Sequence, residues 1–421
     1  MKRLPTVFLV LFIAACSPPY EVAQLACADN NDGLVLPDGF CAVVVIDTLG
    51  RARHMAIRDN GDLFVVLRTP SEEGGIAALR DTTGDGVADV TVWIGDAGGG
   101  GIHLRGDYLY VATDTLIVRY PMAAGELLPT GEAETVVSGF ARQRSHALKP
   151  FEFDDAGSMY VNVGAPSNAC QDPSRTPGVV GQDPCPLLGD YAGVWSFDAD
   201  RTGQTMMDDG YRFASGIRNG VANAWHPEVG KLFVVQHGRD DLHRLWQDRF
   251  TEEQNNELPA EELFVVEDGS DFGWPYCYWD HFKGQKLLNP EYGGDGVTTG
   301  RCEGIGVPIY GFPAHWAPND MVFYLADQFP ARYRGGAFVA FHGSWNREPV
   351  QKGYQVTFLP MDGETPIGEH ESFADGFAGP DSVKTSSMAR ARPTGLAVGP
   401  DGSLYVADSR SGRIWRIIYT G

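Results

Sequence analysis

The chain has 421 residues, of which 43% are hydrophobic, and it contains 52 glycines and 27 prolines. Such a chain can bury one large core, and its many glycines and prolines favour short strands joined by turns. The formal net charge of −22 opposes binding to phosphate backbones and to anionic lipid. Nucleic acid is therefore not expected to be a partner.

The first fifteen residues have the organisation of a secretory signal. Lys2 and Arg3 precede an apolar stretch, residues 4–15, that is too short for a stable membrane span. The sequence IAAC at positions 13–16 resembles a bacterial lipobox, so Cys16 is expected to be acylated and to become the mature N-terminus. The alternative is an ordinary signal peptide in which Cys16 is incidental.

These features predict the domain boundaries and the location of the protein. Residues 1–15 are expected to be the lipoprotein signal peptide, residues 16–26 the lipid anchor and tether, and residues 27–421 the folded domain. Ser17 does not resemble an inner-membrane retention signal. We therefore expect an exported protein that faces the periplasm, on the bacterial outer membrane, and that contacts the membrane only through its N-terminal lipid.

Acylation of Cys16 leaves six of the seven cysteines. An even number in an exported protein predicts disulfides, although six cysteines formally allow fifteen pairings. A metal cluster is the alternative, but the sequence lacks the CxxC and HxxxH spacings that favour one. The cysteines fall into local pairs in loop-like sequence, and the expected bridges are Cys27 with Cys41, Cys170 with Cys185, and Cys277 with Cys302.

A short unit recurs along the chain: a turn containing Asp and Gly, then a strand of aromatic and β-branched residues. The glycine can take the positive φ of a tight turn, and the residues after it suit a buried strand near the centre of a blade. Six copies predict an all-β fold, a six-bladed β-propeller. The copies are residues 60–66, 106–111, 156–161, 229–234, 335–340 and 401–406.

Three further segments bear on this fold. The apolar segment 42–46 is expected to pair with the C-terminal blade, which closes the ring and removes exposed strand edges. Residues 251–262 are the one segment that reads as a helix or a long loop. Two alternatives stay open: a seventh blade in the long gap between Gly230 and Gly336, and a pair of stacked β-sandwiches.

The segment 81–89 places oxygen-bearing side chains at alternate positions and Gly at the sixth, as a calcium loop does. The twelfth position is Val92, which cannot supply the bidentate carboxylate of such a loop. An Asp-Gly hairpin turn between strands 76–79 and 90–93 is therefore preferred, with a Ca²⁺ site as the alternative.

Several polar residues stand beside predicted strands in apolar or glycine-rich sequence, where a propeller would aim them at its axis. Guanidinium groups pair with carboxylates, and a histidine near its free pKa can act as a general base. The set therefore suits an anionic ligand and proton abstraction, and a turn or packing role is the alternative for each residue. The candidates are His146, Arg218, Asn219, His315, Trp345, Asn346, Arg347 and Arg392.

Four segments, taken in their order along the chain, resemble the soluble aldose (glucose) and sorbosone-type dehydrogenases that use pyrroloquinoline quinone (PQQ) on a six-bladed propeller. The resemblance covers most of the chain after its signal sequence. The segments are residues 333–347, Ile217-Arg218-Asn219, Phe272-Gly273-Trp274-Pro275, and Arg392-Pro393 ahead of Gly399-Pro400-Asp401-Gly402.

The resemblance implies that His146 takes the proton from a sugar hydroxyl while hydride passes to PQQ. It implies that the cofactor is held by Arg218, Asn219, Asn346, Arg347 and Arg392, with Arg218 close to the reacting oxygens. Asn346 stands where the glucose-oxidising branch carries a lysine, which puts glucose itself in doubt. In that branch Ca²⁺ is held by backbone carbonyls, which here fall near Gln236, His237 and Gly238, while His315 and His342 are expected to be structural.

The leading hypothesis is thus a PQQ-dependent dehydrogenase that oxidises a sugar or a related polyol or aldehyde. The sequence lacks the CxxCH haem motif, so electrons are expected to leave to a separate acceptor, a cytochrome or a quinone. One alternative is a Ca²⁺-dependent lactonase or esterase, which needs axial Asp, Asn and Glu around the metal. The other is a non-catalytic propeller that binds a carbohydrate or a partner protein.

Overall fold

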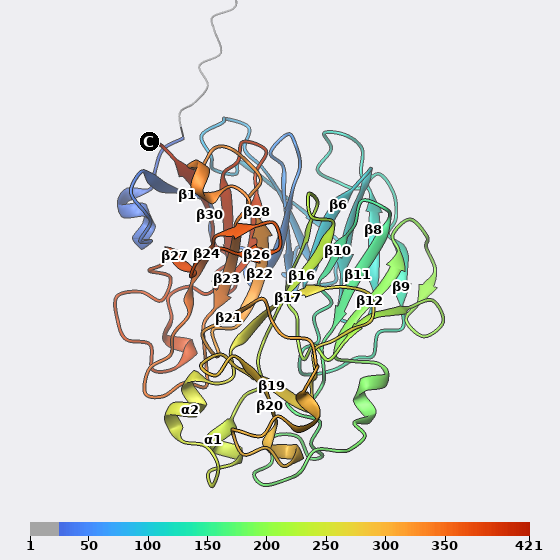
Figure 1. The fold of residues 1–421 in the computed structure, drawn as a ribbon. Coiled ribbons are helices and arrows are strands. Elements are labelled where there is room, and N and C mark those ends of the chain that lie inside the picture. Colours follow the sequence, from blue (N-terminus) through green and yellow to red (C-terminus); the bar gives the residue numbers. More distant parts are fainter. Residues whose placement is uncertain (1–24) are drawn as a thin grey trace, which may run out of the picture.

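Six sheets surround one axis in the computed structural model, which describes residues 25–421 (Figure 1). Each sheet is built around antiparallel strands, and its innermost strand contacts the innermost strands of both neighbouring sheets, so the ring is closed. This confirms the six-bladed propeller and excludes both the seventh blade and the stacked sandwiches. The predicted signal peptide and the acylated Cys16 lie outside the described residues.

The strands of each blade follow one another from the axis outward. The first blade holds β2 (Ala52–Ile57), β3 (Leu63–Leu67), β4 (Ile76–Arg80) and β5 (Val90–Ile94). The second holds β6 (Gly101–Arg105), β7 (Tyr108–Ala112), β8 (Ile117–Pro121), β9 (Glu134–Ser138) and the short β13 (Gln204–Thr205). The third holds β10 (Phe151–Phe153), β11 (Ser158–Val163), β12 (Gly193–Asp198), β14 (Tyr211–Ser215) and the short β18 (Ser270–Asp271).

The other three blades have the same plan. The fourth holds β15 (Ala222–His226), β16 (Lys231–Gln236), β17 (Glu261–Val266) and β21 (Tyr310–Phe312). The fifth holds β22 (Pro318–Phe323), β23 (Ala337–His342), β24 (Tyr354–Leu359) and β27 (Glu371–Ala374). The sixth holds β28 (Pro393–Val398), β29 (Leu404–Asp408), β30 (Ile414–Tyr419) and, from the N-terminal end of the chain, β1 (Phe40–Ile46).

The recurring strand of the sequence is the second strand from the axis in every blade: β3, β7, β11, β16, β23 and β29. Such a strand is buried on both faces, because one hydrophobic cluster fills each of the six spaces between neighbouring blades. In β16, Phe233 and Val235 pack toward the fifth blade, whereas Leu232 and Val234 pack toward the third. Burial on both faces explains why these strands are continuous apolar runs in the sequence.

The ring is closed by β1, as the sequence predicts, with Phe40 opposite Tyr419 and Ile46 opposite Ile414. The Phe40 ring packs edge-on against Phe329, with ring centroids 4.8 Å apart, and against other aromatic rings of the fifth blade. This pairing joins β1 and the C-terminal strand β30 in one sheet, so that β30 has a hydrogen-bonded neighbour on both sides.

The long gap after Gly230 contains loop excursions, not a blade. These are α1 (Leu242–Leu245), α2 (Glu252–Glu257) and the hairpin of β19 (Cys277–Asp280) with β20 (Gln285–Leu288), which gather at one end of the propeller, at the bottom of Figure 1. The segment 251–262, expected to be a helix or a long loop, holds the short helix α2, because Pro259 disfavours helical backbone at the residue before it, and β17 begins at Glu261. A second small hairpin pairs β25 (Met361–Asp362) with β26 (Thr365–Pro366).

All three predicted disulfides are present: Cys27–Cys41, Cys170–Cys185 and Cys277–Cys302. The second and third lie in loops at the same end of the propeller as α1 and α2, where the loops are longest. Within residues 25–421, no helix has the length and apolar character needed to cross a membrane.

The segment 81–89 is the hairpin turn between β4 and β5. Asp81 accepts backbone N–H bonds from Gly84 and Gly86, both at 2.7 Å, and Asp89 accepts from the backbone and hydroxyl of Thr82. Both carboxylates therefore bond the turn itself, which agrees with the preferred interpretation of this segment.

We expect Phe40→Ala to lower the free energy of unfolding by about 3–5 kcal/mol, because the substitution leaves a cavity where β1 closes the ring. Val35→Ala is the matched control: Val35 is 66% exposed and should change the same quantity by less than about 0.5 kcal/mol. Urea unfolding followed by tryptophan fluorescence measures both. A loss of under about 1 kcal/mol for Phe40→Ala would show that closure contributes little.

Candidate functional site

A cavity of about 320 Å³, here called the axial cavity, opens at the end of the propeller that carries the long loops. Neighbouring strands of a blade are antiparallel, so the starts of the innermost strands and the ends of the second strands meet at this end. The cavity is lined from five blades, chiefly by polar side chains: Arg53, Arg68, Arg144, His146, Arg175, Arg218, Asn219, His237, Asp240, Glu261, His315, Asn319, His342, Trp345, Asn346 and Arg392.

The axial cavity is cationic although the chain as a whole is acidic. Six arginines line it against two carboxylates, those of Asp240 and Glu261. Burial raises the pKa of Glu261 to about 8, and both of its oxygens accept backbone N–H bonds, from Gly238 and Ala317. At neutral pH that carboxyl is mostly uncharged, so Asp240 is the main anion facing the arginines.

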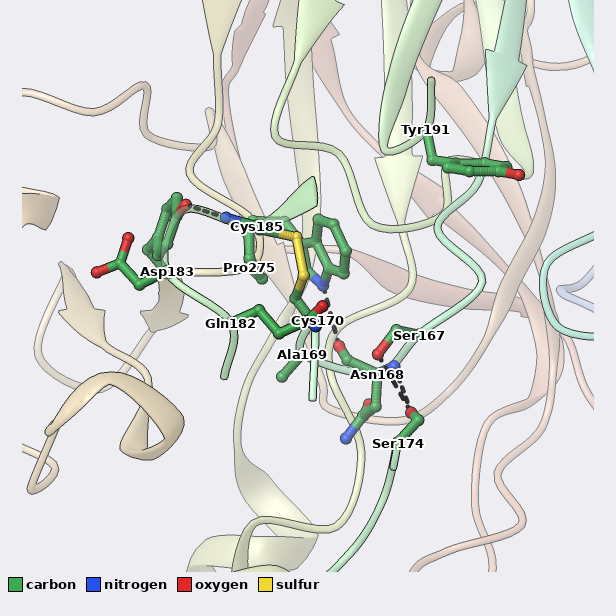
Figure 2. Close-up of a disulfide and its surroundings, with 12 residues drawn as sticks. Ser167, Asn168, Ala169, Cys170, Ser174, Gln182, Asp183, Cys185, Tyr191 and Pro275 are labelled. Atoms are coloured by element: carbon green, nitrogen blue, oxygen red, sulfur yellow. Dashed lines mark hydrogen bonds between the residues drawn. A yellow bond between two sulfur atoms is a disulfide. The ribbon is translucent and has the colours of Figure 1, made fainter. Parts of the chain in front are cut away.

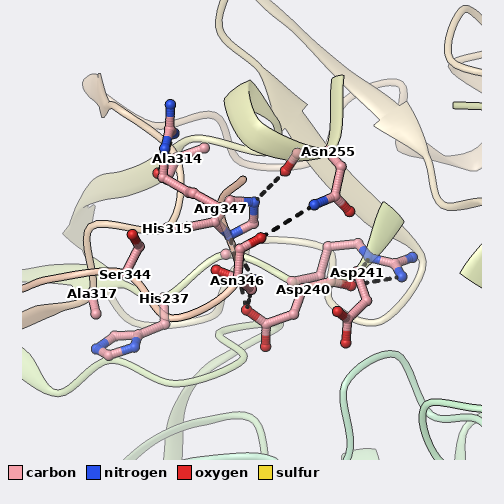
Figure 3. Close-up of polar contacts among 12 residues, drawn as sticks. His237, Asp240, Asp241, Asn255, Ala314, His315, Ala317, Ser344, Asn346 and Arg347 are labelled. Atoms are coloured by element: carbon pink, nitrogen blue, oxygen red, sulfur yellow. Dashed lines mark hydrogen bonds and ion pairs between the residues drawn. The ribbon is translucent and has the colours of Figure 1, made fainter. Parts of the chain in front are cut away.

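Asp240 joins side chains from three separate loops, and Figure 3 shows its contact with one of them, Asn346. Its Oδ2 accepts from Arg218 at 2.8 Å and from Arg175 at 2.6 Å, and its Oδ1 accepts from the Asn346 amide at 2.9 Å. Burial alone would raise the pKa of Asp240, but Arg218 and Arg175 hold it well below its usual value. The carboxylate therefore stays ionised and fixes the three donors relative to one another.

Arg218 uses its whole guanidinium group within the protein. Besides Asp240 it donates to the side chain and backbone oxygens of Asn168, to the carbonyl of Gly238 at 2.8 Å, and to that of His237 at 3.4 Å. Arg218 is 2% exposed, so its orientation is set by these partners and not by solvent.

The loop that carries Asn168 is held by the Cys170–Cys185 disulfide (Figure 2). The Trp274 indole donates to the Asn168 carbonyl at 2.9 Å, and the Asn168 amide oxygen accepts from Arg218 and from the backbone N–H of Asp240. The Phe-Gly-Trp-Pro segment thus acts through Asn168 on the position of Arg218.

The predicted Ca²⁺ ligands do not form a metal site as they are arranged. The carbonyl oxygens of His237 and Gly238 accept hydrogen bonds from Arg218, and the Gln236 side chain bonds the Arg218 backbone and Glu262. Across residues 25–421, no cluster of three His, Cys, Asp or Glu side chains is placed to hold a metal. A cationic guanidinium lies where the resemblance places Ca²⁺, so the residues do not fit that ion.

His146 is held as a neutral imidazole that can accept a proton. Its Nδ1 bonds the Ala165 carbonyl, which can only accept, so Nδ1 carries the hydrogen and Nε2 keeps its lone pair. Burial, and then the Arg218 charge, lowers the pKa of His146 well below its usual value. Its φ of 52° lies in the left-handed region, a strain that the surrounding structure sustains.

Gly164 makes room for this histidine. A Cβ at position 164 would lie 2.7 Å from the His146 Cβ and 2.8 Å from the Asn219 Oδ1. Any side chain there must push both residues aside, so Gly164 is required for their close approach.

Of the other predicted residues, Asn219, Asn346 and Arg392 line the cavity, and Arg347 does not. The buried Oδ1 atoms of Asn219 and Asn346 have no partner among the described residues. The Arg392 guanidinium donates to the carbonyls of His342 and Gly343 at 2.8 and 2.9 Å.

The expected cofactor contact of Arg347 is not supported. Its guanidinium bonds the carbonyls of Asn256 and Ala314 and the carboxylate of Glu257, and it points away from Asp240 (Figure 3). His315 agrees with the structural role expected for it, because its Nε2 bonds the carbonyls of Asn255 and Leu258, although the ring also lines the cavity.

Sequence reasoning missed Asp240, Glu261 and the cavity arginines Arg53, Arg68, Arg144 and Arg175. Among these, Arg53 has free hydrogen-bonding capacity in the cavity. Its buried Nε has no partner in residues 25–421, and burial with the charges of Arg68 and Arg392 lowers its pKa to about 10. A signal was available, since Arg53 is the second residue of an innermost strand, β2, and Arg392 directly precedes another, β28.

Sequence comparison with known proteins identifies a family model and two relatives that match parts of the chain. A family model described as TrAA12-like matches residues 34–420. An uncharacterized protein of Borreliella burgdorferi is 31% identical over 209 residues, which are 49% of this chain and 48% of that protein. A pyrroloquinoline quinone-dependent pyranose dehydrogenase of Coprinopsis cinerea is 28% identical over 229 residues, 48% of this chain and 30% of that protein. The matches thus span less than half the length of either relative.

Solved structures share the fold across nearly the whole chain. The PQQ domain of the Coprinopsis cinerea pyranose dehydrogenase, in its holo form, superposes with a TM-score of 0.73 at 20% identity, over 96% of this chain and 98% of that domain. A calcium structure of a Trichoderma reesei family AA12 enzyme gives 0.72 at 18% identity, over 95% and 99%. The apo aldose sugar dehydrogenase of Escherichia coli gives 0.59 at 16% identity, over 90% and 99%. These matches confirm the resemblance inferred from the sequence.

We expect an NMR histidine titration to show His146 neutral at pH 6.5, with its pKa well below that value, because burial and Arg218 oppose its protonation. In Gly164→Ala the displaced ring should titrate closer to 6.5. A His146→Gln sample assigns the resonance. Gly189→Ala is the control, because a Cβ at Gly189 would meet nothing within 4 Å. A His146 resonance that titrates near 6.5 in the unaltered protein would contradict this account.

Proposed function

The chain belongs to the TrAA12-like family, and on that basis we propose that it is a PQQ-dependent dehydrogenase that oxidises a sugar or a related polyol or aldehyde. The observation that carries the proposal is the pairing of a cationic axial cavity with a neutral histidine base. PQQ is a quinone with three carboxylates, so it needs several guanidinium partners in an otherwise acidic protein.

The donor set fits this cofactor. Arg53 and Arg392 line the cavity and, among the described residues, have no carboxylate partner. The buried Arg53 Nε and the Asn219 and Asn346 Oδ1 atoms also lack partners, and buried polar atoms rarely stay unbonded. We propose that Arg53 and Arg392 hold carboxylates of the cofactor and that Asn219 and Asn346 bond its polar edge.

His146 is the proposed base. When bound, PQQ supplies a quinone carbonyl that accepts hydride from the carbon being oxidised. The hydroxyl proton of that carbon passes to His146 Nε2, while the Nδ1–H bond to Ala165 keeps the lone pair directed at the cavity. The substrate thereby loses two electrons and two hydrogens, and the low pKa of His146 favours release of the proton afterwards.

Arg218 is proposed to polarise the reacting oxygens from its place beside His146. Asp240 and Asn168 hold its guanidinium, so it acts as a fixed charge with little reorganisation. We assign no step to Ca²⁺, because the carbonyls of His237 and Gly238 that would bind it already accept from Arg218.

Trp345 is the proposed contact for the sugar ring. Its side chain is 50% exposed at the mouth of the axial cavity, and the Arg175 guanidinium lies 5.6 Å from its ring centroid on one face. An exposed indole beside a base and polar donors suits the apolar face of a pyranose. We propose that contacts of the sugar with Trp345 and Asn346 determine which sugar, polyol or aldehyde is oxidised.

Electrons are proposed to leave to a separate acceptor, a cytochrome or a quinone. We also keep the proposal that the protein is exported and anchored through Cys16 at a periplasm-facing membrane surface, on the evidence of its N-terminal sequence. The lactonase or esterase alternative is disfavoured, since residues 25–421 hold no acidic metal cluster and the cavity is rich in arginine.

We expect the purified protein, incubated with PQQ, to reduce an artificial dye with at least one sugar of an aldose panel. His146→Gln should lower kcat by about 10²–10⁴ because the proton acceptor is lost, with PQQ affinity changed little. Stopped-flow dye reduction and absorbance titration of PQQ measure the two effects separately.

Ser145→Ala, at an exposed neighbour of the base, is the matched control and should behave as the unaltered protein. If the protein retains PQQ but oxidises no sugar, it would be a PQQ-binding protein and not a sugar dehydrogenase. Full activity of His146→Gln would remove the proposed base.

A further inference from the structure

A second cavity, of about 540 Å³, adjoins the axial cavity and has a basic wall. Four arginines line it, Arg51, Arg53, Arg392 and Arg410, and we call them the arginine rim. Arg53 and Arg392 also line the axial cavity, whereas Arg51 and Arg410 line only the second one. The two cavities therefore share a wall that contains Arg53 and Arg392, the inner pair. Arg51 and Arg410, the outer pair, border the second cavity alone.

The rim has no ion-paired carboxylate within the described chain. None of its four arginines forms an ion pair in residues 25–421, and no Asp or Glu is among the residues that line the second cavity. The Asp408 carboxylate attracts the charge of Arg392, but it is fully buried and accepts hydrogen bonds from the backbone N–H groups of Arg392 and Arg410 and from Ser411, not from a guanidinium. Four like charges that share one buried anion repel one another.

The hydrogen bonds of the rim leave most of its donors free. Arg51 has no side-chain partner in the part of the chain that the structure describes, and Arg410 donates only to the Ser387 carbonyl. Both are exposed, and Ser387 and Ser409 line the same cavity. Guanidinium and hydroxyl donors around an open space are the groups that bind a carboxylate.

We propose that Arg51 and Arg410 bind a carboxylate carried by the substrate, so that the enzyme acts on acidic sugars of the uronic type. The inference rests on the proposed function, in which the inner arginines Arg53 and Arg392 serve the cofactor. The outer pair is solvent-exposed, as a site must be for a group that arrives and leaves in each turnover. A neutral sugar would leave these charges unpaired and gain nothing from them.

The test compares D-glucuronate with D-glucose, and D-galacturonate with D-galactose, on the PQQ-loaded protein and on an Arg51→Gln/Arg410→Gln double variant. We expect the unaltered protein to favour each uronate, with a preference that weakens as salt rises. The double variant should lose about 10- to 100-fold in kcat/KM for the uronates, since each charge-assisted bond contributes about tenfold. The neutral sugars should change less than about twofold.

Arg332→Gln/Arg334→Gln is the matched control, because it removes two exposed arginines ahead of β23, at the opposite end of that strand from His342. PQQ affinity is measured for every variant. A loss of PQQ affinity in the rim variant would assign the rim to the cofactor and overturn the proposal. Equal effects on acidic and neutral sugars, or none on either, would overturn it too.

Calorimetric titration of D-glucuronate and D-glucose into the protein, with and without PQQ, separates this inference from the proposed function. Suppose that no sugar is oxidised, but that the unaltered protein and the control variant bind glucuronate and the rim variant does not. This result would still support the rim as a carboxylate site. Absence of glucuronate binding to the unaltered protein, with and without PQQ, would overturn it.

Discussion

The axial site depends on one buried interaction, the carboxylate of Asp240 held between Arg218 and Arg175. Arg175 stays partly exposed, but removing the Arg218 guanidinium and the Asp240 carboxylate from water is costly, and the cost is offset only when their oxygens and donors are paired. Here the remaining oxygen accepts from Asn346, and Asn168 bonds both Arg218 and the Asp240 backbone. One carboxylate thus fixes side chains from three loops that the fold alone would leave independent.

A fixed excess of positive charge follows from this arrangement. Asp240 neutralises part of the cluster, and burial keeps Glu261 mostly protonated, so the other cavity arginines face an unfilled space. Burial keeps His146 neutral, and the same field adds to this effect, because a proton on His146 would add to the positive charge of Arg218. The excess of positive charge that suits an anionic cofactor therefore also helps to keep the His146 imidazole unprotonated. Gly164 provides the space that His146 occupies.

The blades were predictable because the second strand of each is buried on both faces and so repeats as an apolar run after a glycine turn. His146, Arg218, Asn219 and Arg392 were predictable because each lies just ahead of an innermost strand, and Asn346 because it follows the end of a second strand. The position of the Arg347 side chain outside the cavity was not predictable, because Arg347 and its neighbour Asn346 bond different partners. Asp240, Arg175 and Asn168 lie in long loops without periodicity, so only the folded chain brings them together.

The central claim is that the axial cavity is built for a tricarboxylate quinone. Calorimetric titration of PQQ into the unaltered protein and into Arg53→Gln/Arg392→Gln tests it most directly. We expect one PQQ to bind per chain, with an affinity that falls as salt is raised and that the double variant lowers at least about 100-fold. Absence of binding by the unaltered protein, or binding that neither salt nor the two substitutions weaken, would contradict it.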